Sequence, residues 1–204
     1  MSIQQRRARE REELREDILE AARTMFVKDG YENVSIRKLA DRIEYSPGTI
    51  YLYFKDKADI FDTLCEQTFA KLRKRMQGIA EDTGDPLERL RRAGRAYIDF
   101  AIENPNEYMV TFVAKQERSQ DEVDITRLQT SGMACFDCLR NLVRQGIEED
   151  RIRFTDVEEV SQSLWATMHG VAVLLITCCG FPFIEHSRLV ERTVDIAIEG
   201  IRKR

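Results

Sequence analysis

The 204-residue sequence has few residues that break helices and only two histidines. It contains only four prolines and ten glycines, which is typical of an ordered, helix-rich chain. Its two histidines have no metal-ligand spacing to any cysteine pair, and there is no glycine-rich phosphate loop or Ser-His-Asp arrangement. We therefore expect no metal site, no cofactor and no enzymatic activity.

Long apolar runs and a disulfide framework are missing as well. The most apolar stretch, residues 170–179, is about half the roughly 20 residues that a bilayer span needs, and no signal peptide follows Met1. We expect a cytoplasmic protein with no membrane partner. The five cysteines are then best read as small buried hydrophobes. Cys135 and Cys138 lie three residues apart in a predicted helix, and both a redox switch and simple packing remain open for them.

Charge is unevenly distributed along the chain, whose formal net charge is −4. Residues 1–57 carry twelve basic and eleven acidic side chains, a net of +1, so residues 58–204 carry a net of −5. Any contact with DNA must therefore come from a local patch. The clearest basic feature is Arg6, Arg7, Arg9 and Arg11. It is either a solvated run of charge or an arm that reaches a minor groove.

Apolar residues recur at three- and four-residue spacings along nearly the whole chain, and no segment alternates with the two-residue period of a strand. The pattern predicts an all-α protein of about nine helices. Start signals such as Ser46-Pro47 and Asp85-Pro86 help to place them. The expected helices span 13–28, 36–43, 46–54, 57–78, 87–103, 105–115, 123–149, 156–180 and 187–202.

The second and third of these helices are short and are separated by a tight turn, which makes them a candidate helix-turn-helix. From Ser35 to Phe61 the sequence resembles the DNA-binding domain of the TetR family. The matching elements are Ile36-x-x-Leu39-Ala40, Ser46-x-Gly48-Thr49-Ile50-Tyr51-x-Tyr53-Phe54 and Lys55-x-Lys57. The family usually has glycine and a small aliphatic residue in the turn, whereas this chain has Glu44 and Tyr45. A non-glycine residue in a left-handed turn costs on the order of 1–2 kcal/mol, so the turn was expected to differ locally.

The resemblance implies that residues 46–54 form a recognition helix that enters the major groove of double-stranded operator DNA. Ile50 and Phe54, four residues apart, would anchor it in the core. The residues expected to contact DNA are Ser35, Arg37, Lys38, Ser46, Pro47, Gly48, Thr49, Tyr51, Tyr53 and Lys55.

The resemblance also predicts three parts: an arm and helix-turn-helix domain over 1–56, a connecting helix over 57–78, and a ligand-binding and dimerisation domain over 79–204. Trp165, His169 and Gly170 resemble a Trp-His-Gly subgroup of TetR C-terminal domains. A homodimer is expected through the last two helices. A small, largely apolar effector, which the sequence does not identify, is expected to release a repressor from its operator. Its predicted binding residues are Tyr97, Phe100, Tyr108, Phe112, Trp165 and His169, for each of which core packing is the alternative.

Two other functions were weighed against this interpretation. The sequence contains no motif that supports an enzyme, as described above. A helical ligand carrier with a degenerate DNA-binding head is disfavoured because Thr49, Tyr51 and Lys55 are intact.

Overall fold

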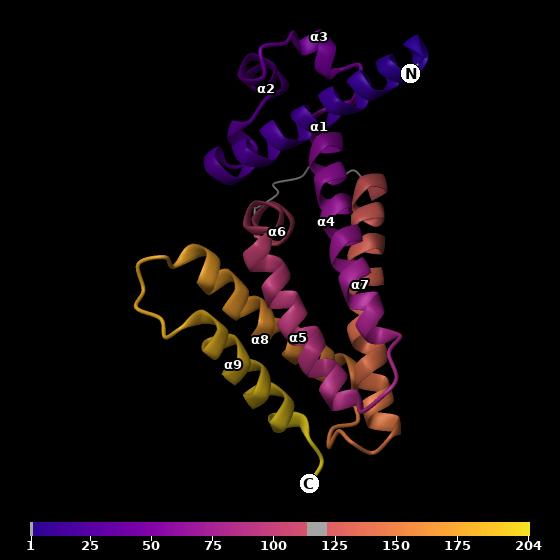
Figure 1. The fold of residues 1–204 in the computed structure, drawn as a ribbon, viewed down its shortest axis with the longest axis vertical. Coiled ribbons are helices and arrows are strands. Elements are labelled where there is room, and N and C mark those ends of the chain that lie inside the picture. The colour runs from indigo at the N-terminus through magenta and orange to yellow at the C-terminus, as the bar shows by residue number, and fades with distance from the viewer. Residues whose placement is uncertain (1, 114–121) are drawn as a thin grey trace. The chain divides into compact units, whose positions relative to one another are not determined.

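The computed structural model describes the backbone of residues 2–113 and 122–204, with side chains described from residue 130 onward in the second range. Over these residues the chain is built from α-helices and one short 3-10 turn, so the all-α prediction is confirmed (Figure 1). The helices are α1 (Ile3–Asp29), α2 (Ile36–Arg42), α3 (Pro47–Ile50), α4 (Lys57–Ala80), α5 (Pro86–Glu103), α6 (Pro105–Phe112), α7 (Glu122–Glu148), α8 (Val157–Thr177) and α9 (His186–Ile201), with the 3-10 turn η1 at Tyr31–Asn33.

The chain divides into two compact units, and the division falls inside α4. The first unit is Met1–Thr68 with Asn106–Leu128, and the second is Phe69–Pro105 with Gln129–Arg204. These units are defined by contacts. The functional boundaries expected from the sequence, at residues 56 and 78, stay a prediction.

The first unit has a core formed by α1, α2, α3 and the first half of α4. An aromatic cluster lies at its centre, where the rings of Phe26, Tyr31 and Phe61 have centroids 5.2–5.5 Å apart. Lys57 closes the cluster at the start of α4, because its Nζ donates to the Tyr31 carbonyl at 2.9 Å and lies 4.0 Å from the Tyr31 ring centroid. Around the cluster lie the other buried residues Ile18, Leu19, Ala22, Val34, Leu39, Ala40, Ile50, Phe54, Ile60, Leu64 and Cys65.

The two largest differences from the predicted helix ends lie in the first unit, and α6 and α8 each end about three residues earlier than predicted. Helix α1 begins at Ile3 instead of residue 13, because Ser2 and Gln5 form a capping box at its start. The predicted recognition helix over 46–54 is shorter, since the α-helix ends at Ile50. Backbone bonds from Leu52 to Thr49 and from Tyr53 to Ile50 span three residues, so a tighter turn continues the chain to Phe54.

The turn after α2 keeps a left-handed conformation although it lacks glycine. Glu44 has φ +61°, and the amides of Glu44 and Tyr45 donate to the carbonyls of Asp41 and Ala40 at 3.4 and 3.0 Å. These two bonds form a Schellman motif, which is a usual way to end a helix. The expectation that this turn differs locally was therefore wrong. The chain accepts the backbone strain at Glu44 in order to keep the geometry.

The second unit packs α5, α8 and α9 against one another, and residues of small volume let the helices approach closely (Figure 1). A Cβ added to Gly94 of α5 would lie 3.3 Å from Met168 Sδ and 3.6 Å from Val194 Cγ2. Gly94 is therefore explained by helix packing. Buried side chains of the three helices include Leu90, Ile98, Leu164, Met168, Ala172, Val190, Val194 and Ile198.

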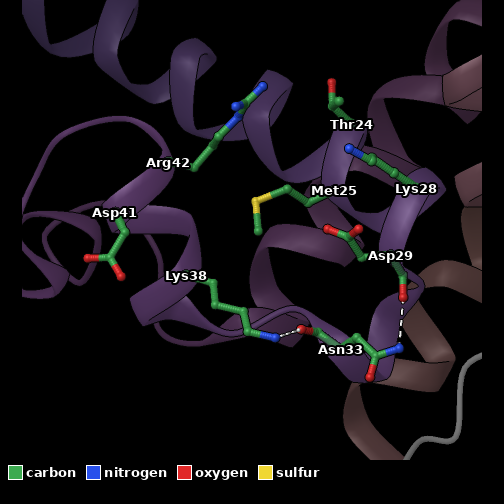
Figure 2. Close-up of a pocket in the computed structure, with 8 residues that line it drawn as sticks. All are labelled: Thr24, Met25, Lys28, Asp29, Asn33, Lys38, Asp41 and Arg42. Atoms are coloured by element: carbon green, nitrogen blue, oxygen red, sulfur yellow. Dashed lines mark hydrogen bonds between the residues drawn. The ribbon is translucent and has the colours of Figure 1, made fainter.

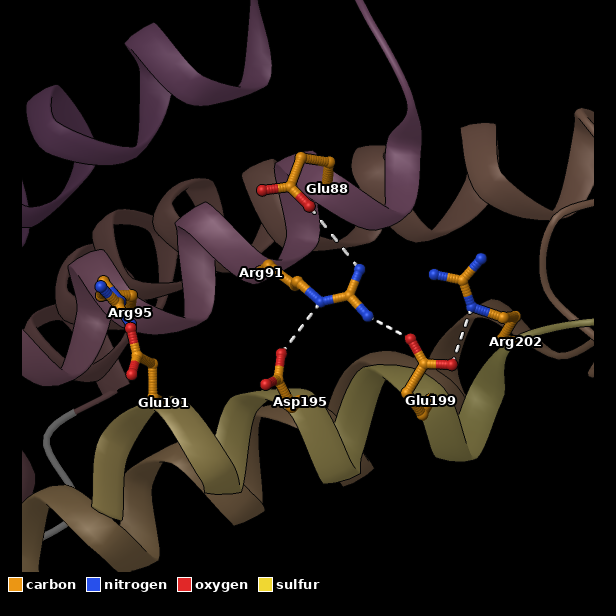
Figure 3. Close-up of polar contacts among 7 residues, drawn as sticks. All are labelled: Glu88, Arg91, Arg95, Glu191, Asp195, Glu199 and Arg202. Carbon is orange, nitrogen blue, oxygen red and sulfur yellow. Dashed lines mark hydrogen bonds and ion pairs between the residues drawn. The ribbon is translucent and has the colours of Figure 1, made fainter. Parts of the chain in front are cut away.

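Ion pairs join α5 to α9 along the edge of this core, as Figure 3 shows. Arg91 Nε lies 3.2 Å from Asp195 Oδ1, and its guanidinium also contacts Glu199 and Glu88. Arg95 lies 2.7 Å from Glu191. The acidic residues of α9 at positions 191, 195 and 199 are four residues apart and hence lie along one side of the helix. That side of α9 therefore forms ion pairs with α5.

A buried arginine in the first turn of α5 connects three helices. The Arg89 side chain is almost fully buried and donates to the carbonyls of Ile79 and Ala80, the last two residues of α4. It also donates to Gln145 Oε1 of α7 at 2.6 Å. The final carbonyls of a helix have no partner within it, so Arg89 both caps α4 and has its own charge compensated.

Helix α8 is long and apolar, yet much of it is exposed in the single chain. Among the described residues it is the one helix whose length and composition would allow a membrane span, which by itself is weak evidence for one. Only a third of its apolar window is buried, and no Asp, Glu, Lys or Arg occurs between residues 160 and 177. Its exposed side is the stripe Ser163, Thr167, Gly170, Leu174 and Thr177.

Candidate DNA-binding surface and ligand site

Two serines start the short helices of the candidate helix-turn-helix. Ser35 Oγ accepts the Lys38 amide at the start of α2, and Ser46 Oγ accepts the Thr49 amide at the start of α3, both at 3.2 Å. Pro47 occupies the first turn of α3, where a missing N–H has no cost. Ser46 Oγ is also 3.0 Å from the Thr49 hydroxyl. Both serines and Pro47 thus have local structural roles, which the sequence analysis anticipated.

The α-helix α3 and the turn that follows it, residues 46–54, form what we call the recognition element, which is anchored on one side and exposed on the other. Ile50 and Phe54 are buried in the core of the first unit, as predicted. In contrast, 57% of Tyr51 and 72% of Leu52 are exposed, and both lie between the two buried anchors. Large side chains on a short, fixed turn can contact a partner with little loss of conformational entropy. The exposed face is therefore suited to binding.

Gly48 has no side chain and therefore leaves the backbone of α3 accessible on its exposed side. A Cβ added there would meet only Ser46 Oγ, at 3.6 Å, which is an ordinary contact. Internal packing therefore does not require glycine at this position. An external surface that approaches the backbone closely would require it.

Tyr53 lies beside α1 and not in the open. The Arg11 guanidinium stands 5.7 Å from the Tyr53 ring centroid, and the Arg15 guanidinium stands 5.2 Å from that of Phe54. Lys55 is exposed, with its amide held by Asp59 Oδ2 at 2.9 Å. Its ammonium group is therefore presented from a fixed backbone.

The two basic residues expected on α2 differ in surroundings. Arg37 is exposed. Lys38 Nζ donates to the Asn33 carbonyl at 2.8 Å and lies in an open hollow between α1 and α2, which Figure 2 shows. To reach a phosphate, Lys38 would have to give up this bond. The hollow has a volume of about 820 Å³ and is lined by Thr24, Met25, Lys28, Asp29, Asn33, Lys38, Asp41 and Arg42.

Sequence reasoning did not place Arg11 beside Tyr53 or recognise Leu52 as an exposed side chain. The first contact joins residues far apart in the chain, and no local pattern marks it. The exposure of Leu52 follows from its position between two anchors, so the spacing of Ile50 and Phe54 already contained that signal.

Three of the predicted ligand residues come together in the second unit. Trp165 Nε1 of α8 donates to the Tyr97 hydroxyl of α5 at 3.0 Å, and that hydroxyl is 3.3 Å from His169 Nδ1. The rings of Trp165 and His169 are 5.6 Å apart. Phe136 of α7, which the sequence did not single out, packs edge-on against Trp165 at 6.0 Å.

The Tyr97 hydroxyl accepts from Trp165, and its contact with His169 Nδ1 has the tyrosine or the imidazole as donor according to the histidine tautomer. Burial lowers the pKa of His169 below its ordinary value of 6.5, which favours the neutral imidazole. The cluster thus places polar groups among aromatic rings.

The other predicted ligand residues lie elsewhere. Phe100 is buried in the second unit. Tyr108 and Phe112 belong to the first unit, where their ring centroids are 4.7 Å apart and Tyr108 is fully buried. These three have the environment expected of packing residues.

The cysteine pair on α7 has the environment of packing residues too. Burial raises the pKa of Cys135 to about 12 and also raises that of Cys138. Because the thiolate is the reactive form, both thiols are poorly suited to oxidation at neutral pH. The redox alternative is disfavoured.

Two family models match most of the chain. The model of bacterial regulatory proteins of the tetR family matches residues 18–64, which contain the helix-turn-helix described above. The model of the tetracyclin repressor-like C-terminal domain matches residues 90–197, more than half of the chain.

Curated relatives and solved structures agree with these matches. The chain is 29% identical over 154 residues to the nucleoid occlusion factor SlmA of Sodalis glossinidius, covering 75% of each chain. It is 26% identical to the transcriptional activator FasR of Mycolicibacterium smegmatis, over 76% of this chain and 70% of that one. It is 27% identical to the transcriptional repressor KstR2 of Mycobacterium tuberculosis, over 68% and 69%.

Among solved structures, KstR2 of M. tuberculosis superposes with a TM-score of 0.75 at 24% identity, over 93% of this chain and 95% of that one. The regulator FadR of Bacillus subtilis, in complex with stearoyl-CoA, gives 0.76 at 20% identity, over 91% and 98%. These structures have the same fold. The chain therefore belongs to the tetR family of bacterial regulatory proteins, and is a DNA-binding transcriptional regulator and not an enzyme.

Proposed function

We propose that this protein is a cytoplasmic, homodimeric repressor that leaves its operator when a largely apolar small molecule binds the second unit. The observation that carries the DNA-binding part is the exposed, low face of α3, where Gly48 is not required by internal packing and Tyr51 projects outward. A major groove about 12 Å wide admits one such element.

The proposed DNA contacts have distinct roles. Gly48 and Thr49 face base edges, where the threonine offers a hydroxyl group and a methyl group. Tyr51, Lys55 and Arg37 are exposed and contact phosphates. Ser35, Ser46, Pro47, Lys38 and Tyr53 complete the proposed surface.

The proposed dimer forms through the exposed sides of α8 and α9. The uncharged stripe of α8 includes Leu174, which is 48% exposed. On α9, the apolar residues Val190, Val194, Ile198 and Ile201 are buried within the chain and are not available to an interface. A second apolar side remains, formed by Leu189, Thr193, Ile196, Ala197 and Gly200, with Ile196 66% exposed.

These two helix faces carry no charge and leave the large apolar side chains of Leu174 and Ile196 in water. A twofold axis would pair α8 and α9 with their copies in a four-helix interface and bury both faces. The same axis would present two recognition elements to one duplex, so the operator is expected to be a near-palindrome.

The proposed effector site is centred on the cluster of Tyr97, Trp165 and His169. Its rings provide apolar contacts, and the imidazole of His169 and the hydroxyl of Tyr97 provide polar character for the polar end of a ligand. Relatives support this chemical class, since the FadR structure holds stearoyl-CoA and the KstR2 structure is described as a ketosteroid regulator. Phe100 is retained as a proposed contributor to the site, ligand binding by Tyr108 and Phe112 of the first unit stays an untested prediction, and the Trp-His-Gly subgroup stays a proposal.

The proposal is tested in two steps with the full-length protein. The first step selects a duplex that the protein binds from a random library. The second step measures the affinity for that duplex with and without saturated and aromatic acyl thioesters and acids. A compound that raises the melting temperature is expected to weaken DNA binding about 5–150-fold, the usual range of allosteric coupling. Hits that stabilise the protein but leave DNA affinity unchanged contradict the ligand response. Failure to select any duplex contradicts the DNA-binding function.

A further inference from the structure

The first turns of α1 form a helix that extends well beyond the core of the first unit. Ser2 Oγ accepts the Gln5 amide at 3.2 Å, while Gln5 Oε1 accepts the Ser2 amide at 2.8 Å, so the helix end is capped. The first buried residue of α1 is Ile18. Residues 3–17 form a helical rod about 22 Å long, at 1.5 Å per residue, in which no side chain is fully buried.

Charges on this rod, which we call the α1 extension (residues 3–17), are divided between its sides. Arg6 pairs with Glu10 at 3.5 Å and Arg9 with Glu13 at 2.8 Å. Arg7 and Arg11 have no carboxylate within ion-pair distance among the residues that the structure describes. One side is thus neutralised within the helix, whereas two guanidinium groups on the other side keep their full charge.

Helix geometry shows which way the unneutralised side faces. Eleven residues make just over three whole turns, so Arg7 shares a face with Ile18, and Arg11 shares it with Ala22. Both Ile18 and Ala22 are buried in the core of the first unit. Arg7 and Arg11 therefore lie on the side of α1 that faces this core.

The contacts of Arg11 agree with this geometry. Its guanidinium lies over the ring of Tyr53, at the end of the recognition element, and Arg15 lies over the adjacent Phe54. Figure 1 shows the N-terminal part of α1 running beside α3 and continuing past it. Arg7 lies one turn nearer to the start of α1 than Arg11 and is exposed.

We propose that the α1 extension is a second, rigid DNA contact, in which Arg7 and Arg11 bind backbone phosphates that flank the half-site read by α3. This inference rests on the proposed DNA-binding function and extends its footprint outward. Guanidinium groups bind phosphate oxygens in a bidentate manner. Because the helix is already formed, little ordering entropy is lost on binding, in contrast to a flexible arm.

The test compares two double variants of the full-length protein. Arg7→Ala with Arg11→Ala removes the unneutralised side, while Arg6→Ala with Arg9→Ala removes the same charge from the paired side. Alanine favours helix, so both variants keep α1, which circular dichroism verifies. Binding is measured by fluorescence anisotropy between 50 and 200 mM salt, on the duplex that the wild-type protein selects from a random library and on that duplex trimmed to its two half-sites.

On the longer duplex, Arg7→Ala with Arg11→Ala is expected to reduce the salt slope by about 0.9 for each lost phosphate contact, close to 4 for a dimer. The control variant is expected to retain most of the slope, and the difference between the variants should vanish on the trimmed duplex. If both variants change the slope equally, or if the difference persists on the trimmed duplex, the inference is overturned while the proposed function stands. If the wild-type protein selects no duplex, the proposed function itself fails.

Discussion

Replacement of Glu44 by glycine should stabilise the protein. Glu44 is exposed and has φ +61° at the end of α2, where its amide takes part in the Schellman motif. The left-handed conformation costs a residue with a side chain about 1–2 kcal/mol, whereas the greater freedom of glycine in the unfolded chain costs about 0.5–1 kcal/mol. The net gain in the free energy of unfolding is therefore about 0.5–1 kcal/mol.

The matched control is Glu44→Ala, which removes the same carboxylate but keeps the backbone strain. Thermal unfolding at one protein concentration should raise the midpoint of Glu44→Gly by about 1–4 °C over that of Glu44→Ala. The alanine variant should differ little from the wild type. If the glycine variant is no more stable than the alanine variant, the strain assigned to this turn is absent and the reasoning is refuted.

A second residue in the left-handed conformation allows the stabilising effects of two glycine substitutions to be ranked. Asp150 has φ +57° at the end of α7, in the same hydrogen-bonding pattern. Aspartate tolerates this conformation better than glutamate, because its short side chain can bond locally. It also forms an exposed ion pair with Lys203, which glycine would lose. Asp150→Gly should thus stabilise less than Glu44→Gly, and the reverse order would contradict the account.

Three further predictions follow from individual side chains. Gly48→Ala should raise stability by about 0.5–1 kcal/mol, because its Cβ has room, yet should weaken DNA binding; a variant that binds the selected duplex as tightly as the wild type excludes close approach at this position. Gly170→Arg should convert the dimer to monomers by light scattering, whereas Gly78→Arg, at an equally open helical glycine on α4, should not; equal masses for both variants argue against the α8 interface. Burial lowers the pKa of His169, so the unfolded chain binds this proton more readily, and the stability of the wild type relative to His169→Gln should fall as pH drops below about 6.5; a difference that is constant from pH 7.5 to 5 would contradict it.

The sequence predicted those parts of the structure that local chemistry determines. The caps at Ser35, Ser46 and Asp56 and the buried anchors Ile50 and Phe54 were all foreseeable, because each depends on residue types within four positions. The turn at Glu44 was misjudged for an instructive reason. Intrinsic preference disfavours glutamate there, but the packing of α2 against α3 imposes the conformation.

Contacts between distant segments could not be predicted in the same way. The helical start of α1 depends on the Ser2–Gln5 capping box, although the apolar pattern that marks a buried helix begins only at Leu14. The bond from Trp165 to Tyr97 requires α5 and α8 to be adjacent, which periodicity does not specify. The sequence also could not show that the six expected ligand residues are divided between two units. They were chosen because their side chains are aromatic, which does not determine the unit to which each belongs.

The most direct test of the central claim, that the exposed face of the recognition element binds operator DNA, is the affinity of three variants for the selected duplex. Tyr51→Ala and Lys55→Ala remove exposed side chains of the proposed surface, and Lys74→Ala removes an exposed lysine from α4 as the charge-matched control. The account predicts that Tyr51→Ala and Lys55→Ala weaken binding at unchanged melting temperature, and that Lys55→Ala lowers the salt slope by about 0.9 per protomer. Lys74→Ala should change neither the affinity nor the salt slope. Unchanged affinity in both Tyr51→Ala and Lys55→Ala would contradict the account.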